Sequence, residues 1–135
     1  MRSVVITGAS TGIGWASAKL LLDRGFRVFG SVRKQADADR LKREFGVNFT
    51  PLLFDVTDEA AVLAAARQVR NALGGETLAG LVNNAGIAVA GPVLGLAAAE
   101  FRRQMDVNVI GPVIATQAFG PQLGADPELK GPKGR

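Results

Sequence analysis

The chain alternates between short runs of apolar residues and longer segments in which apolar residues recur every three or four positions. Short continuous runs are typical of strands covered on both faces, and the longer spacing is typical of amphipathic helices. The pattern predicts strands over residues 4–6, 27–32, 49–54 and 78–82. It predicts helices over residues 13–23 and 37–45, and a third from Thr57 or Asp58 to Leu73, each followed by glycine.

The remainder of the chain is less regular. The pattern is broken from residue 83 to about residue 95, and a long helical stretch, the fifth helix, then runs from Leu96 towards Leu123. Strands that alternate with helices form βαβ units with right-handed crossovers. We therefore predict an α/β fold with a doubly wound parallel sheet over residues 1–123, followed by a Gly/Pro-rich, basic, linker-like tail over residues 124–135.

Composition narrows the class of protein. The chain is 47% hydrophobic and 21% charged, enough to bury a core. It has no Cys, which excludes disulfides and thiolate chemistry, and no His, the commonest general base and metal ligand. No metal site is therefore expected.

Charge and hydropathy argue against nucleic-acid and membrane partners. The net charge is +4, but Lys130, Lys133 and Arg135 at the end of the tail supply three of these four charges, so the body is nearly balanced. Two uncharged stretches, residues 77–99 and 107–125, approach the length of a membrane span, but their Asn, Gly and Pro residues favour a buried core. We expect a soluble, cytoplasmic protein.

A glycine-rich turn follows the first predicted strand. Residues 7–14 read TGASTGIG. Ligands of a doubly wound sheet bind beyond the carboxyl ends of the strands, where the next helix offers unpaired N–H groups to an anion such as a pyrophosphate. Gly8, Gly12 and Gly14 would keep Cβ atoms out of its way, and Ser10 and Thr11 would add hydroxyl donors. A turn that only makes a corner is the alternative; a phosphate-loop NTPase is excluded because no Gly-Lys-Ser/Thr follows.

The spacing of this turn resembles the short-chain dehydrogenase/reductase family, whose signature is Thr-Gly-x-x-x-Gly-x-Gly. Three further matches follow in the order of that family: Asp55-Val56, Asn83-Asn84-Ala85-Gly86 and Asn108-Val109-Ile110-Gly111. The resemblance covers residues 3–123 and implies a Rossmann-like fold. It also implies hydride transfer between a nicotinamide cofactor and a small-molecule carbonyl compound or secondary alcohol.

The resemblance also implies a cofactor site. Asp55 would bond the adenine amino group with Val56 beside it, and Asn83, Ala85 and Gly86 would line the adenosine-ribose side. Helix capping or turn chemistry just before the third helix is the alternative for Asp55, and it is compatible with the adenine contact. A turn that pairs its own backbone is the alternative for Asn83-Asn84. The cofactor-binding residues that we predict are Gly8, Ser10, Thr11, Gly12, Ile13, Gly14, Arg33, Asp55, Val56, Asn83, Ala85 and Gly86.

The end of the second strand indicates which dinucleotide is bound. Folds that choose NAD place an acid there to bond the adenosine ribose. Here Val32 stands in that place and Arg33 follows. A carboxylate would repel a 2′-phosphate, whereas a guanidinium bonds it. We therefore predict NADP rather than NAD; the alternative is that Arg33 and Lys34 only solvate the end of the strand.

Pro112 interrupts the fifth helix. Proline has no N–H, so the carbonyl of Asn108, four positions earlier, loses its helical partner and the helix should kink. In the family that the chain resembles, the corresponding Asn holds a water in a proton relay through its main-chain carbonyl. Asn108 is therefore our one candidate catalytic residue, and a kink that only relieves packing is the alternative.

Other catalytic residues of that family are missing. Its tyrosine acts as acid and base, a lysine four positions later lowers the tyrosine pKa, and a serine positions the substrate oxygen. The chain has no Tyr, and its last Ser is Ser31. We expect these residues to be the cofactor half of the enzyme, truncated after the fifth helix and inactive alone. A non-catalytic dinucleotide-binding module and an inactive fragment are the alternatives.

The resemblance gives two further expectations. By the strand order of the family, the fourth strand would be an exposed apolar edge, which is an aggregation hazard. Relatives commonly pair through the fifth helix, so a homo-oligomer is possible. Residues 87–95 would contribute a rim to the substrate pocket. They are apolar, which favours a non-polar substrate without identifying it.

Overall fold

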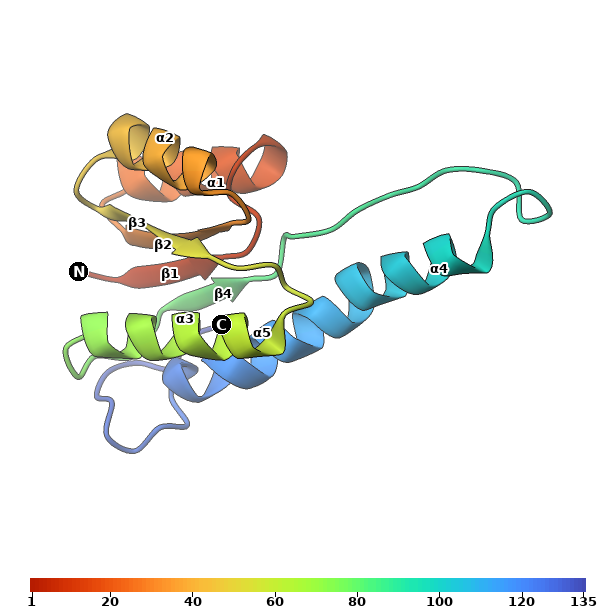
Figure 1. Ribbon diagram of the computed structural model, residues 1–135. Coiled ribbons are helices and arrows are strands. Elements are labelled where there is room, and N and C mark those ends of the chain that lie inside the picture. Colours follow the sequence, from red (N-terminus) through yellow and green to blue (C-terminus); the bar gives the residue numbers. More distant parts are fainter.

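The computed structural model describes residues 1–135 and contains one four-stranded sheet (Figure 1). The spatial order of the strands is β3-β2-β1-β4, and every neighbouring pair is parallel. The strands are β1 (Ser3–Ile6), β2 (Arg27–Val32), β3 (Phe49–Leu53) and β4 (Gly80–Val82). The predicted parallel α/β fold is confirmed, although β4 begins two residues later than predicted.

Helices cover both faces of the sheet (Figure 1). One face packs against α1 (Gly12–Asp23) and α2 (Gln35–Phe45), and the other against α3 (Glu59–Ala72) and α5 (Gly111–Phe119). Successive residues of a strand point to opposite faces, so Val4 and Ile6 join the first core while Val5 joins the second. Asp58, one of the two predicted caps of α3, accepts a hydrogen bond from the N–H of Ala61 at 3.1 Å.

The predicted long helix is divided at the predicted place. Helix α4 (Ala98–Met105) passes into a π-helical turn, η1 (Asp106–Ile110), then into α5, and ends in a 3₁₀ turn, η2 (Gly120–Leu123). The N–H of Gly111 bonds the carbonyl of Asp106, five positions back. Because Pro112 has no N–H to donate four positions back, the wider π-helical turn replaces a regular one at this point.

The segment between β4 and α4 extends away from the sheet with α4 as an arm (Figure 1). Val93 and Leu94 in this segment are fully or largely exposed. Along α4 and η1, Phe101, Met105 and Val109 are also exposed. The last three of these side chains lie on the helical stretch through which we expect pairing of two copies, and that pairing stays a prediction.

The tail packs on the body of the protein, which differs from our expectation of a linker. Leu129 is buried among the residues of the second core. Beside β4, the N–H of Leu81 donates to the carbonyl of Arg135 at 2.8 Å, and the N–H of Arg135 donates to the carbonyl of Ala79 at 3.1 Å. The edge of β4 is therefore partly covered and not fully exposed as predicted.

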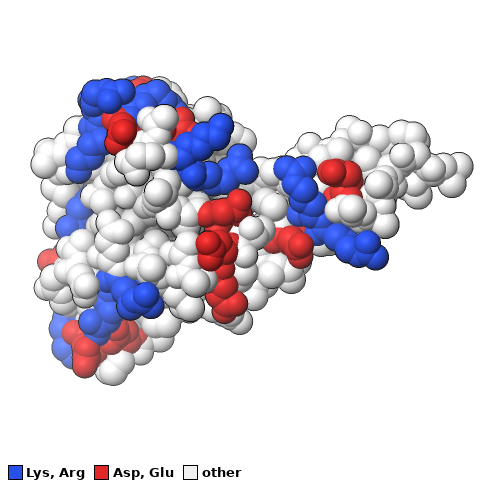
Figure 2. Space-filling model, viewed as in Figure 1, with Lys and Arg blue, Asp and Glu red and all other residues white.

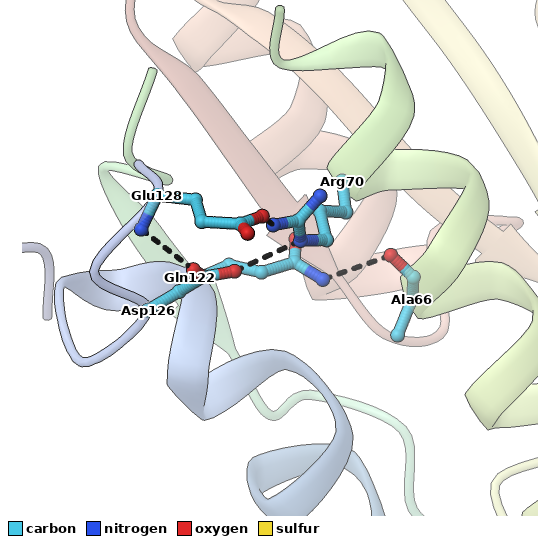
Figure 3. Close-up of polar contacts among 5 residues, drawn as sticks. All are labelled: Ala66, Arg70, Gln122, Asp126 and Glu128. Atoms are coloured by element: carbon cyan, nitrogen blue, oxygen red, sulfur yellow. Dashed lines mark hydrogen bonds and ion pairs between the residues drawn. The ribbon is translucent and has the colours of Figure 1, made fainter. Parts of the chain in front are cut away.

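Polar contacts with α3 hold this tail (Figure 3). Arg70 donates to Asp126 at 2.8 Å and also to Glu128. The bond from Arg70 lowers the pKa of Asp126 below its ordinary value. Just before the tail, the buried Gln122 amide of η2 donates to the carbonyl of Ala66 at 2.8 Å. The composition of the tail predicts a linker because composition does not register contacts between distant residues. The partners in the Arg70–Asp126 and Ala66–Gln122 contacts are each 56 positions apart.

Basic and acidic side chains are interspersed on the face drawn in Figure 2, and the far part of the arm carries almost none. None of the helices combines the length and the apolar character that crossing a bilayer requires.

Candidate functional site

A cavity of about 600 Å³ lies beyond the carboxyl ends of the strands. Its wall is formed by the turns that follow β1, β2, β3 and β4, and by α4 and η1 on the outer side. Small-molecule and cofactor pockets occupy roughly 300–1,000 Å³ and occur at this end of open α/β sheets. The cavity therefore has the position and the size of a ligand site.

The glycine-rich turn between β1 and α1 needs glycine for two reasons. Gly8 and Gly12 have φ values of +71° and +62°, in the left-handed region that residues with a Cβ rarely adopt. Gly14 lies in α1, where a Cβ would overlap the carbonyl oxygen of Gly8 and lie 2.5 Å from Nδ2 of Asn84. No atom lies within 4 Å of the Cβ position of Gly12, and the predicted role of this glycine beside an anion stays a prediction.

Thr7 and Asn84 join this turn to the one after β4. The buried Oγ1 of Thr7 accepts from the N–H groups of Asn84 and Ala85, both at 3.0 Å. In return, Nδ2 of Asn84 donates to the carbonyls of Thr7 at 3.1 Å and Gly8 at 2.8 Å. The Asn84 side chain thus bonds the neighbouring turn. One alternative left open by the sequence was a turn in which Asn83-Asn84 pairs its own backbone.

Ser31 fixes the same turn from β2. Its hydroxyl accepts a hydrogen bond from the N–H of Gly8 at 2.8 Å, and its carbonyl accepts from the N–H of Ala9 at 2.8 Å. Ser31 is buried. Sequence reasoning missed this residue, although a hydroxyl within an apolar strand is a signal, because buried polar groups need a partner.

The carboxylate of Asp55 is held as an anion. Its Oδ1 accepts from the N–H of Thr57 at 3.0 Å and from the hydroxyl of Thr57 at 2.8 Å. The bond from the backbone of Thr57 lowers the pKa of Asp55 below its ordinary value; partial burial opposes this, and the Thr57 hydroxyl and the Arg33 charge reinforce it. The other oxygen, Oδ2, has no hydrogen bond. Asp55 therefore both shapes its own turn and presents a free acceptor.

Asn108 contacts the segment after β4 through its side chain. Its Oδ1 accepts from the N–H of Ile87 at 2.8 Å, and its Nδ2 donates to the carbonyl of Ile87 at 2.7 Å. We predicted a role for its main-chain carbonyl, and no local sequence signal indicates this contact of the side chain. The amide pair ties the π-helical turn to the rim of the cavity.

The structure brings most of the predicted site residues to one cavity. The predicted residues that line it are Gly8, Ser10, Thr11, Arg33, Asp55, Val56, Ala85 and Gly86. The predicted residues outside its wall are Gly12, Ile13, Gly14, Asn83 and Asn108. Among these, Asn83 turns to α5 and donates to the hydroxyl of Thr116 at 3.1 Å. Sequence reasoning did not anticipate Arg102 and Arg103 of α4, which line the outer side.

A doubly wound parallel sheet with a glycine-rich first turn and a cavity over its carboxyl ends defines the Rossmann-type class of dinucleotide-binding folds. The family described as short chain dehydrogenase matches residues 2–135. The chain belongs to the short-chain dehydrogenase/reductase family.

Two curated relatives illustrate the relationship. The chain is 42% identical over 130 residues to NADPH-dependent 3-dehydrocapnine reductase of Ornithobacterium rhinotracheale, covering 96% of this chain and 46% of that protein. It is 39% identical over 121 residues to human retinol dehydrogenase 5, covering 89% and 38% respectively. The chain thus spans less than half the length of these relatives.

Solved structures share the fold. The NADPH-bound carbonyl reductase from chicken fatty liver superposes with a TM-score of 0.83 at 34% identity, covering 91% of this chain and 52% of that one. A 3-ketoacyl-(acyl-carrier-protein) reductase from Brucella melitensis, complexed with NADH, gives a TM-score of 0.85 at 31% identity, covering 93% and 51%. Similar folds therefore hold both nicotinamide dinucleotides.

Proposed function

We propose that these residues form the cofactor-binding part of an NADP-dependent oxidoreductase that transfers hydride between the nicotinamide and a carbonyl compound or secondary alcohol. The observation that carries the proposal is the cavity, which joins the glycine-rich turn to the end of β2, where Val32 stands in the place of an acid and Arg33 follows. The names of an NADPH-dependent reductase and an NADPH-bound carbonyl reductase among its relatives support it.

The first turn of α1 suits a diphosphate. Thr11, at the N-cap, makes no side-chain capping bond, and the first turn contains no acidic residue. The first N–H groups of a helix have no partner within the helix, and the helix dipole favours an anion there. Thr11 lines the cavity and no atom lies within 4 Å of the Cβ position of Gly12, so we expect these donors to be accessible to a diphosphate.

The other walls suit the adenosine end. The free Oδ2 of Asp55 would accept from the adenine amino group, and the backbone of Ala85 and Gly86 would run along the ribose. Arg33 would bond the 2′-phosphate, which is the feature that separates NADP from NAD. When bound, the nicotinamide would supply or accept the hydride, and Asn108 would hold the rim through Ile87.

Arg33→Gln tests the choice of cofactor. A charge-assisted hydrogen bond contributes about 1.5–3 kcal/mol, so this substitution should weaken NADPH binding roughly ten- to hundredfold and leave NADH binding unchanged. Fluorescence titration of both dinucleotides measures the effect. Arg24→Gln removes an exposed guanidinium outside the cavity wall and is the matched control. Equal NADPH affinity in the two variants would show that Arg33 only solvates the strand end.

Binding of the dinucleotide without turnover is a second candidate function. The chain contains no Tyr, and the family that it belongs to is expected to use a tyrosine as the proton donor. NADPH that binds but is not oxidised in the presence of aldehydes and ketones would identify this candidate. Oxidation of NADPH under those conditions would favour the first.

A further inference from the structure

Arg40 connects α2 to the glycine-rich turn. Its Nη2 donates to the carbonyl oxygen of Ser10 at 2.8 Å, across 30 positions of sequence. Ser10 lines the cavity, whereas Arg40 does not. The guanidinium therefore bonds the backbone of the turn and does not itself line the cavity.

Two carboxylates orient the same guanidinium. Nη2 of Arg40 lies 3.3 Å from Oδ1 of Asp37, and Nη1 lies 3.5 Å from Oε2 of Glu44. Asp37 and Glu44 lie three and four positions from Arg40 on α2, which is the spacing of neighbours on one face of a helix. All three side chains are partly exposed, so these ion pairs add little stability. Their effect is to restrict the directions in which the Arg40 fork can point.

We propose that Arg40 is a positioning residue for the diphosphate of the dinucleotide, an inference that rests on the proposed function. The carbonyl of Ser10 and the N–H of Thr11 belong to one peptide unit. A donor on the carbonyl polarises that unit, so its N–H becomes a stronger donor on the other side. The bond also restrains the plane of the peptide between Gly8 and Gly12, two residues in the left-handed conformation that glycine adopts most readily.

The position of Arg40 also predicts which dinucleotide should bind more weakly when Arg40 is replaced. Both NADPH and NADH carry the diphosphate, and only NADPH carries the 2′-phosphate. Because Arg40 acts on the turn and lies outside the cavity wall, both dinucleotides should be affected alike. This pattern differs from that of Arg33, whose loss should affect NADPH alone.

The experiment compares Arg40→Gln with Arg43→Gln. Arg43 is exposed on the same helix and has no ion pair or hydrogen bond through its side chain, so both substitutions remove one positive charge from α2. Calorimetric titration should show NADPH and NADH each binding about fivefold more weakly to Arg40→Gln, and with unchanged affinity to Arg43→Gln. Arg40→Lys should restore part of the affinity, since an ammonium donates to Ser10 but lacks the planar fork. Circular dichroism confirms that each variant is folded.

A second measurement needs no ligand. Amide hydrogen exchange of residues 10–14 should be faster in Arg40→Gln than in the wild type and in Arg43→Gln, because the turn has lost its external tie. If the wild type binds neither dinucleotide, the proposed function fails, while the exchange rates still test whether the Arg40–Ser10 hydrogen bond restrains the turn. If the wild type binds but Arg40→Gln matches Arg43→Gln in affinity, or loses affinity for NADPH alone, the positioning role is wrong.

Discussion

Gly14→Ala should lower the free energy of unfolding by about 3 kcal/mol, the upper part of the range for an overpacked site. The added methyl group would overlap the carbonyl oxygen of Gly8 and come within 2.5 Å of Nδ2 of Asn84. The backbone carbonyl cannot turn away as a flexible side chain could, and Asn84 would lose its bond to Gly8, which is 2.8 Å long. Urea denaturation, followed by circular dichroism, measures the change.

Gly12→Ala is the matched control for this substitution. It adds the same methyl group to the same turn, at a position with nothing within 4 Å. Its cost is the left-handed backbone alone, at about 1–2 kcal/mol. A loss from Gly14→Ala no larger than that from Gly12→Ala would contradict the close packing of α1 against the turn.

Thr7→Val should cost about 3 kcal/mol of stability, although the two side chains have nearly the same shape. Valine has no acceptor for the N–H groups of Asn84 and Ala85, both of which now bond the Thr7 hydroxyl at 3.0 Å. A buried donor left without a partner costs about 1–3 kcal/mol, and here two donors of partly buried residues are affected, for an expected sum of about 3 kcal/mol. Urea denaturation of the variant gives the stability.

Thr7→Ser separates the hydroxyl from the methyl group. Serine keeps the acceptor and should lose only about 1 kcal/mol, near the value of one buried methyl group. If Thr7→Val were as stable as Thr7→Ser, the hydroxyl would not be what joins the turns after β1 and β4.

The fold was predictable because its signals are local. The apolar runs of β1 and β2 and the spacing in α1 each lie within a dozen consecutive residues, and the structure places them within one residue of the prediction. The division of the long helix was predictable from Pro112, because a missing N–H acts only four positions away. Leu78 joins the core but not β4, since burial alone does not make a residue part of a strand.

The contacts that hold the site together were not predictable in the same way. Thr7 and Asn84 are 77 positions apart, and Arg40 and Ser10 are 30 positions apart. From its sequence neighbours alone, each of these residues would be interpreted as part of a strand end, a turn or a solvated helix face. Only the parallel sheet order, which places β1 between β2 and β4, brings their polar groups within hydrogen-bonding distance.

The same reasoning applies to the tail. Residues 124–135 have the composition of a linker, and Asp126 and Glu128 are ordinary surface acids in the sequence. Both acids pair with Arg70 of α3 (Figure 3). Further along the tail, the backbone of Arg135 bonds the backbone of Ala79 and Leu81. The attachment depends on a helix that ends more than fifty positions earlier, which composition does not register.

Calorimetric titration of the wild-type protein with NADPH and with NADH, at one fixed salt concentration, tests the central claim most directly. The account predicts one site per chain, with NADPH bound roughly tenfold or more tightly than NADH because only NADPH offers a 2′-phosphate to Arg33. No heat of binding with millimolar NADPH, or equal affinity for the two dinucleotides, would contradict it.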